Sequence, residues 1–188
     1  MRCFVALPLP AGPVRALEAV QDGLKLGRPT DPEQMHLTLA FLGERPDADI
    51  EAAHEALSDI RRPAFEVRIR GLDTFRTPDG GLTIWAALAD PAPVAALAAK
   101  VRSALHGVGL PLERRRFRPH VTLTRLSPAE ATDEPAIARA LARWSAFPCP
   151  PFTADEMVLY RSTLLKSGAV HDDLARYPLE GGSVAFEV

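Results

Sequence analysis

Cysteine is scarce in this chain, with only Cys3 and Cys149 among its 188 residues. Two thiols cannot form the disulfide framework that stabilises many small secreted proteins. They also do not stand at the short spacing at which pairs of cysteines bind zinc. We therefore expect two reduced thiols in a cytoplasmic protein.

An excess of charge is also missing, because 22 Lys and Arg residues stand against 24 Asp and Glu residues, giving a net charge of −2. Proteins that coat long nucleic acids or anionic membranes are normally basic. Long apolar runs are absent as well: the apolar start ends at Pro8, and the Ala-rich stretch near 92–105 contains Lys100 and Arg102. We expect no membrane partner, and we expect any polyanion to be bound locally.

Hydrophobic residues make up 47% of the chain and charged residues 24%, which excludes intrinsic disorder. Hydrophobic periodicity then predicts alternating elements. The expected strands are 2–7, 35–42, 65–70, 82–88, 119–126 and 152–161. The expected helices are 13–26, 50–60, 94–105 and 128–144, the last opened by a capping box at Ser127 and Glu130. A polar, hairpin-like tail, 162–188, ends in the alternating residues 184–188.

The order strand, helix, strand, helix, strand therefore occurs twice, with a turn signal at Asp79-Gly80-Gly81 between the two halves. We predict one domain over 1–188, made of two pseudo-repeats (roughly 1–78 and 82–161) and a C-terminal tail. Such a repeat suggests two similar lobes related by a pseudo-twofold axis.

The same motif stands at matching places in the two halves: His36-Leu37-Thr38-Leu39 and His120-Val121-Thr122-Leu123. Residues i and i+2 of a strand point to the same face, so each motif presents an imidazole and a hydroxyl together. The intervening aliphatic residues then point to the opposite, buried face. A single His-x-Thr is most simply a detail of strand packing, but the pair predicts a shared site.

Two histidines and two threonines that meet across a cleft can carry out phosphoryl transfer without a metal. Near pH 7 one imidazole can be neutral and take a proton from water, while the other is protonated and gives a proton to a leaving oxygen. Threonine hydroxyls can hold the phosphate oxygens. A zinc site is the competing interpretation, but the chain has no His-x-x-x-His, no pair of cysteines at ligand spacing and no Asp or Glu two residues from either histidine. We expect no metal and no cofactor.

Arginines are concentrated around the second motif, at Arg114, Arg115, Arg116 and Arg118 before it and Arg125 after it. A charge run of this kind is often a solvated basic loop. Beside the paired motif it fits an electropositive rim for phosphate better. Arg125 lies three residues after Thr122 and would point away from the cleft in a regular strand. Only a bulge or the end of the strand would bring it into the site.

The motifs resemble the two-histidine (2H) phosphoesterase superfamily, and within it the RNA 2′,3′-cyclic phosphodiesterase family, also called 2′-5′ RNA ligase. The likeness covers nearly the whole chain. It rests on the strings RCFVAL (2–7), HLTLAFLGE (36–44), FRPHVTLTR (117–125), LYRSTL (159–164) and LARYPL (174–179). It implies an α+β, bilobal fold with two pseudo-symmetric lobes, antiparallel sheets lining a central cleft, and helices outside.

The resemblance also implies hydrolysis of an RNA or nucleoside 2′,3′-cyclic phosphate to a 2′-phosphate, with a 2′-5′ joining activity in reverse. His36 corresponds to the proton donor and His120 to the proton acceptor, with Thr38 and Thr122 as phosphate-binding residues. Arg118 and Arg125 are further candidates for substrate binding. Phe41 is a candidate for stacking on a base, the alternative being a core aromatic.

The chain departs from the family pattern at Gly168-Ala169-Val170-His171, where the family often has an aromatic. We expect His171 to be a solvated loop residue, and His54 and His106 to be structural. A non-catalytic module that binds RNA ends or nucleotides in the same cleft is the alternative function. The physiological RNA, the base preference, the balance between hydrolysis and ligation, and the oligomeric state stay open.

Overall fold

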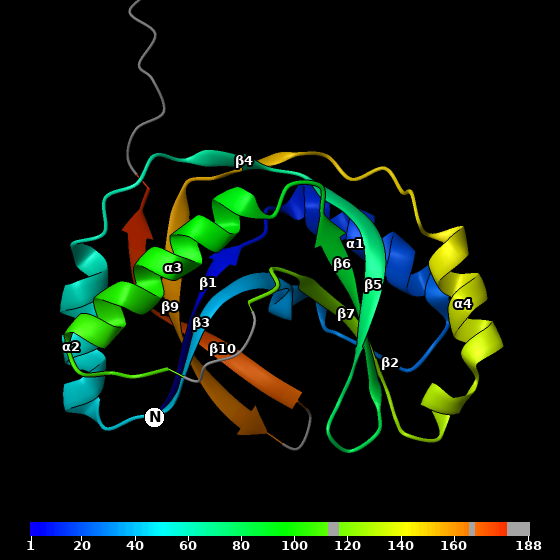
Figure 1. Cartoon of the computed structure of the whole chain (residues 1–188), viewed down its shortest axis with the longest axis horizontal. Helices are drawn as coiled ribbons and strands as arrows, with labels where there is room; N and C mark the ends of the chain where they lie inside the picture. Colours follow the sequence, from blue (N-terminus) through cyan, green and yellow to red (C-terminus); the bar gives the residue numbers. More distant parts are fainter. Residues whose placement is uncertain (113–116, 166–167, 180–188) are drawn as a thin grey trace, which may run out of the picture.

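The structure is a computed structural model of the chain and describes residues 1–112, 117–165 and 168–179. Two four-stranded antiparallel sheets form its centre (Figure 1). The first sheet has the strand order β10-β9-β1-β3 and the second has the order β2-β7-β6-β5, while β4 and β8 pair separately. The α+β class is therefore confirmed.

The elements have the following bounds in chain order. They are β1 (Arg2–Pro8), α1 (Ala11–Leu24), β2 (Arg28–Pro29), the 3₁₀ helix η1 (Pro32–Gln34), β3 (His36–Glu44), α2 (Asp47–Ser58), β4 (Phe65–Val67), β5 (Ile69–Arg76), β6 (Leu82–Leu88), α3 (Ala92–Gly107), β7 (Val121–Leu126), the 3₁₀ helix η2 (Glu130–Thr132), α4 (Glu134–Arg143), β8 (Phe152–Ala154), β9 (Glu156–Leu165) and β10 (Gly168–Pro178).

Each sheet combines strands from distant parts of the chain. The first sheet joins β1 and β3 with β9 and β10 from the C-terminal part, and the second joins β6 and β7 with β2 and β5 from the first half. Cutting the chain near residue 80 would therefore not separate the two sheets. The pseudo-repeats 1–78 and 82–161 remain a prediction.

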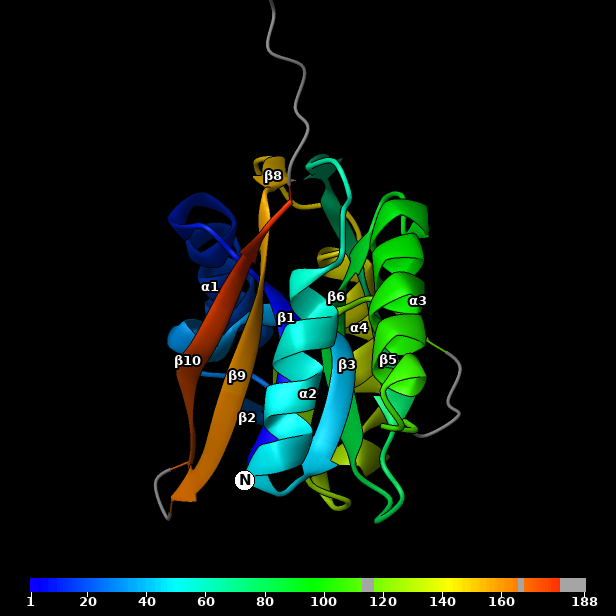
Figure 2. The same ribbon diagram turned by 90° about the vertical axis from the view of Figure 1, so that its left-hand side faces the viewer.

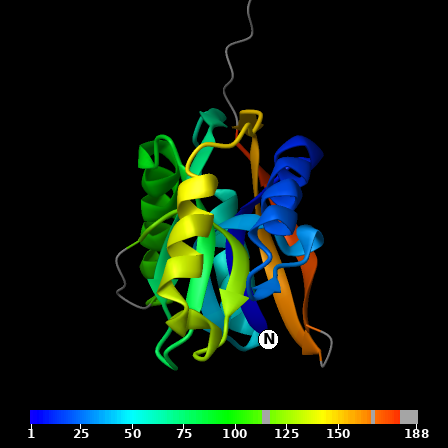
Figure 3. The same ribbon diagram turned by 90° about the vertical axis from the view of Figure 1, so that its right-hand side faces the viewer.

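The helices lie outside the sheets. Helices α2 and α3 pack against each other, and α4 lies at the far side of the molecule, as Figures 1, 2 and 3 together show. Helix α3 also contacts β3, and α1 contacts β7. In the part of the chain that the structure describes, no helix has the length and apolar character needed to cross a membrane.

The apolar positions of the paired motif lie in the core, as the alternation predicts. Leu37 and Val121 have no exposed surface, and Leu39 and Leu123 have at most 1%. They belong to one hydrophobic cluster that also includes residues of α1, α2 and α3. Because these positions are buried, the register of β3 and β7 is strongly specified, since a slip by one residue would expose them.

The predicted start of the fourth helix is wrong. The capping box forms, because the Ser127 N–H donates to Glu130 Oε2 at 2.8 Å and the Glu130 N–H donates to the Ser127 hydroxyl at 3.4 Å, but only the short η2 turn follows it. Helix α4 begins at Glu134, where the Asp133 carboxylate accepts a hydrogen bond from the Ala136 N–H at 3.0 Å. The reason is Pro135, which has no N–H to continue a helix from 128 and is tolerated only in a first turn.

The predicted hairpin-like tail, 162–188, contributes the end of β9 and all of β10, which pair antiparallel, so the hairpin begins within the expected strand 152–161. Two expected strands are each divided in two: 65–70 becomes β4 and the start of β5, and 152–161 becomes β8 and part of β9. The alternating residues 184–188 lie outside the described part of the chain.

Candidate active site

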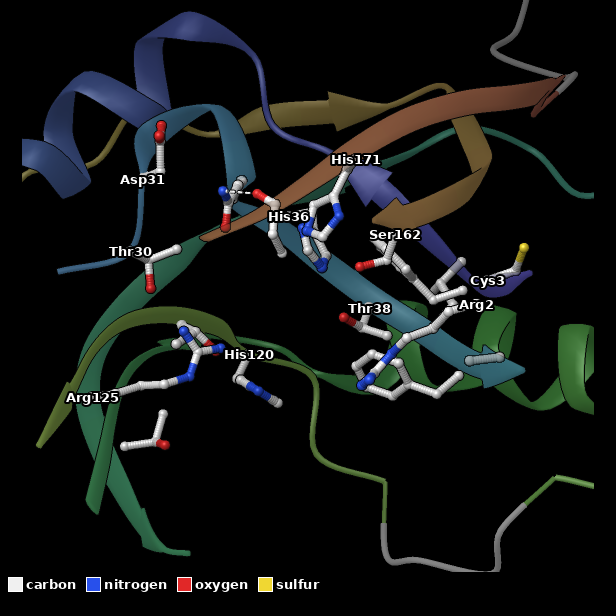
Figure 4. Close-up of a pocket in the computed structure, with 18 of the residues that line it drawn as sticks. Arg2, Cys3, Thr30, Asp31, His36, Thr38, His120, Arg125, Ser162 and His171 are labelled. Carbon is white, nitrogen blue, oxygen red and sulfur yellow. Dashed lines mark hydrogen bonds between the residues drawn. The ribbon is translucent and has the colours of Figure 1, made fainter. Parts of the chain in front are cut away.

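The two His-x-Thr motifs line one cleft between the sheets, with a volume of about 1590 Å³ (Figure 4). His36 and Thr38 come from β3, at the edge of the first sheet, while His120 immediately precedes β7, which carries Thr122. All four side chains are partly buried. The structure therefore brings together the residues that the sequence pairs.

A β-bulge follows the threonine in each motif. In the β1–β3 pair, Val5 and Ala6 stand opposite Ala40 and Thr38, so Leu39 is an extra residue. In the β6–β7 pair, Ile84 and Trp85 stand opposite Thr124 and Thr122, so Leu123 is the extra residue. A bulge of this kind shifts the alternation of side chains by one position.

The bulges explain how Phe41 and Arg125 reach the cleft. Both side chains line it, together with the His and Thr residues of their own strand. Phe41 is 64% exposed, so the interpretation of Phe41 as a core aromatic is wrong. Arg125 points toward His120 (Figure 4), which a regular strand would not allow.

Helix α1 and the segment after it hold the second bulge in place. Gln21 Nε2 donates hydrogen bonds to the carbonyls of Leu123 and Thr30, at 2.6 and 2.8 Å. The Thr30 N–H also donates to the Leu123 carbonyl at 2.7 Å, and the Thr124 hydroxyl donates to the Leu26 carbonyl at 2.7 Å. The carbonyl of the inserted residue Leu123 is thus satisfied, as buried polar groups require.

The imidazole of His36 is packed among aromatic rings. It stacks on Phe4 with ring centroids 4.8 Å apart and has Tyr160 at 6.2 Å and His171 at 5.5 Å. Burial lowers the pKa of His36 to about 4, with further lowering by His171, His120 and Arg125, while a backbone hydrogen bond to Gln34 opposes the shift. His36 is therefore neutral at pH 7 in the free protein.

His120 is oriented by the backbone of its own segment. Its Nδ1 is 2.7 Å from the carbonyl oxygen of Arg118, which can only accept, so the proton of the neutral ring lies on Nδ1. Nε2 is then unprotonated and can act as a base. Phe75 and Trp85 pack around the ring, with centroids at 4.9 and 5.5 Å. Burial lowers the pKa of His120, and Arg125 lowers it further.

The arginines near the second motif differ in what the structure shows of them. Arg118 is exposed at the cleft and orients His120 through its carbonyl. Arg125 stands opposite Arg28 of β2, and burial together with the charge of Arg28 lowers its pKa. Arg114, Arg115 and Arg116 lie outside the described residues.

His171 is the residue of this cleft that the sequence did not reveal. It lies on β10 opposite Ser162 of β9, is partly buried, and points toward His36 (Figure 4). The expectation of a solvated loop is therefore wrong. No local signal marks it, because its place depends on the register of the β9–β10 pair.

No group of three or more His, Cys, Asp or Glu residues that could hold a metal ion occurs within 1–112, 117–165 and 168–179. The two cysteines are free, and burial raises the pKa of each thiol. The two motifs and Arg125 bring imidazole, hydroxyl and guanidinium groups to the cleft.

Residues 9–164 match the family model of the 2′-5′ RNA ligase superfamily. The chain belongs to this superfamily. Among curated relatives in the superfamily, the RNA 2′,3′-cyclic phosphodiesterase of Thermus thermophilus is 31% identical over 96% of this chain and 91% of its own length. That of Geobacillus stearothermophilus is 29% identical over 95% of this chain, which spans 57% of that relative.

Solved structures of the 2′-5′ RNA ligase superfamily show the same fold. Escherichia coli LigT in its apo form aligns with a TM-score of 0.75 and 26% identity over 96% of this chain and 98% of LigT. LigT complexed with 3′-AMP aligns with a TM-score of 0.73 and 25% identity over the same shares. The bilobal two-histidine phosphoesterase fold that the motifs implied is therefore confirmed.

Proposed function

We propose that this protein hydrolyses RNA or nucleoside 2′,3′-cyclic phosphates to 2′-phosphates by paired histidine catalysis. The observation that carries the proposal is the meeting of two His-x-Thr motifs in one cleft, each followed by the same bulge. The names of the relatives and the complex of LigT with 3′-AMP support the class of substrate.

The reaction requires one proton to be taken and one to be given. His120 Nε2 accepts a proton from water while the water oxygen forms a bond to phosphorus. The bond from phosphorus to O3′ breaks, and His36 gives its proton to that oxygen. Each proton transfer contributes about 10²–10⁴-fold to the rate. The Nδ1 hydrogen bond of His120 to the Arg118 carbonyl supports its role as the base.

The phosphate must also change the protonation state of the cleft. His36 is neutral in the free protein, so it acquires the proton it later gives when the anionic substrate binds. An anion beside an imidazole favours the charged form and raises its pKa. Thr38, Thr122 and Arg125 are placed to hold the phosphate oxygens, and Phe41 is exposed at the cleft for stacking on a base.

The test is turnover of a 2′,3′-cyclic nucleotide by EDTA-treated protein, with the product identified as the 2′- or 3′-phosphate by ³¹P NMR. We expect the 2′-phosphate, and we expect His36→Ala and His120→Ala each to lower kcat by at least about 10²-fold. His106→Gln, an exposed position in the last turn of α3, is the matched control and should retain full activity.

Binding of the nucleotide without turnover would favour the non-catalytic alternative and sink the proposal. Activity that is present without EDTA and lost in EDTA would contradict metal-free catalysis. The reverse, 2′-5′ joining reaction is measured with cyclic-phosphate and 5′-hydroxyl RNA ends in excess. The same two histidine variants should lose it, because an acid–base pair works in both directions.

A further inference from the structure

A third imidazole contacts the proposed proton donor. The ring of His171 meets that of His36 edge to face, with centroids 5.5 Å apart, and both rings also contact Phe4, at 4.9 and 4.8 Å. The three side chains come from three strands of the first sheet, β10, β3 and β1. The contact between the two imidazoles is therefore set by the sheet itself.

The charged groups around this pair act differently on its two rings. The groups that act on His36 are His171 from β10 and His120 and Arg125 from the second sheet, all cationic when protonated. Tyr160 from β9 is the remaining titratable neighbour in ring contact, and burial raises its pKa to about 12, so it stays neutral. On β10 itself, Asp172 raises the pKa of His171, although it is also paired with Arg161 at 2.9 Å.

We propose that His171 is a positioning residue that acts through His36, its positive charge opposing protonation of His36 and so making His36 a stronger acid. Two imidazolium ions this close repel each other, and partial burial leaves little water to screen them. Burial lowers the pKa of His171 as well, while the Val170 backbone and Asp172 oppose that shift and favour its charged form.

The consequence concerns the low-pH limb of the reaction. Because kcat/KM reports the protonation states of the free protein, the proposed mechanism gives a bell-shaped profile of kcat/KM, highest where one of His36 and His120 carries a proton and the other does not. The low-pH limb then reports His36, whose pKa is about 4. Without the charge of His171, this limb should move to higher pH while the high-pH limb stays in place.

The experiment compares His171→Phe, which keeps an aromatic ring, with His171→Gln, which removes ring and charge, and His171→Lys, which keeps a charge. The pKa of His36 is measured in each by ¹⁵N-edited NMR of its imidazole, with His106→Gln as the control. We expect it to rise by about 1, a tenfold change in proton affinity, in the Phe and Gln variants and to change little in the Lys variant and the control. If His171 had a purely structural role, its variants would lower the activity without changing the pKa of His36.

Two results would overturn the inference. One is an unchanged pKa of His36 in His171→Phe. The other is a pKa of His36 that rises in His171→Gln but not in His171→Phe, since this would show that the packing of the ring, and not its charge, sets the pKa. If acid unfolds the free chain first, the titration is repeated with saturating inorganic phosphate, which raises the pKa into a range where the chain is folded. The same order among the variants is then expected.

The link to catalysis rests on the proposed function, but the two can fail separately. Absence of turnover in the wild-type chain would refute the proposed function and leave the NMR titration to decide the coupling of His171 to His36. A pKa shift in the variants without the matching move of the low-pH limb would overturn the assignment of that limb to His36.

Discussion

Removing the side chain of Gln21 should weaken both the fold and the binding of phosphate. Gln21 donates to the carbonyl of the bulged residue Leu123 and to that of Thr30, at 2.6 and 2.8 Å. A neutral hydrogen bond contributes about 1 kcal/mol net, so Gln21→Ala should lower the free energy of unfolding by about 2 kcal/mol. Alanine forms helices at least as well as glutamine, so a propensity effect in α1 would have the opposite sign.

The effect on binding follows from what the bulge positions. Leu123 is the residue whose insertion turns Arg125 toward the cleft. The Thr30 N–H, which donates to the Leu123 carbonyl at 2.7 Å, is not removed by the substitution. The bulge should therefore loosen without disappearing. We expect the affinity for inorganic phosphate to fall about tenfold, the loss of roughly one charge-assisted hydrogen bond.

Urea denaturation measures the free energy of unfolding, and calorimetric titration with inorganic phosphate measures the affinity. Arg15→Ala, on the exposed side of the same helix, is the matched control and should change neither. Reduced stability with unchanged phosphate affinity would show that Arg125 does not depend on the bulge. If Gln21→Ala behaved like the control in both measurements, the reasoning about the bulge would be refuted.

Two further predictions concern pH and base stacking. The pKa of His36 falls from 6.5 to about 4 on folding, so between these values the unfolded chain binds a proton that the folded chain lacks. Stability should therefore decrease as pH falls from 6.5 to 4, by about 3 kcal/mol from this group, and His36→Gln should flatten that dependence in urea titrations. Phe41 is 64% exposed, so Phe41→Ala should leave stability nearly unchanged. It should weaken binding of 3′-AMP by about 1–3 kcal/mol but not binding of inorganic phosphate, and equal losses for both ligands would argue against stacking.

The sequence predicts local structure well where a single element determines the pattern. The alternation at His36–Leu39 and His120–Leu123 follows from the strands themselves, and the buried Leu37 and Val121 confirm it. Helices α1, α2 and α3 lie where their apolar spacing predicts. The likeness to a known family added the fold, which periodicity alone does not give.

The sequence does not predict features that depend on a partner strand. The bulges at Leu39 and Leu123 exist only relative to β1 and β6, so the direction of Arg125 could be stated only as a condition. His171 reaches the cleft because β10 pairs with β9 in a register that places it opposite Ser162. The start of α4 was misplaced because the capping box at Ser127 is complete in the sequence, while the interruption comes from Pro135 farther along.

The residue that faces the cleft after each bulge differs between the two motifs, and this difference matters for the proposed reaction. The two motifs share His, Thr and the inserted leucine, and a cleft with two equal walls would accept a nucleotide in either of two orientations. The next cleft-facing residue breaks this equivalence, because it is the aromatic Phe41 on β3 and the cation Arg125 on β7. A nucleotide therefore gains stacking on one wall and charge on the other only in one orientation. Since that orientation fixes which histidine faces O3′ and which faces the attacking water, two nearly identical motifs can take different roles.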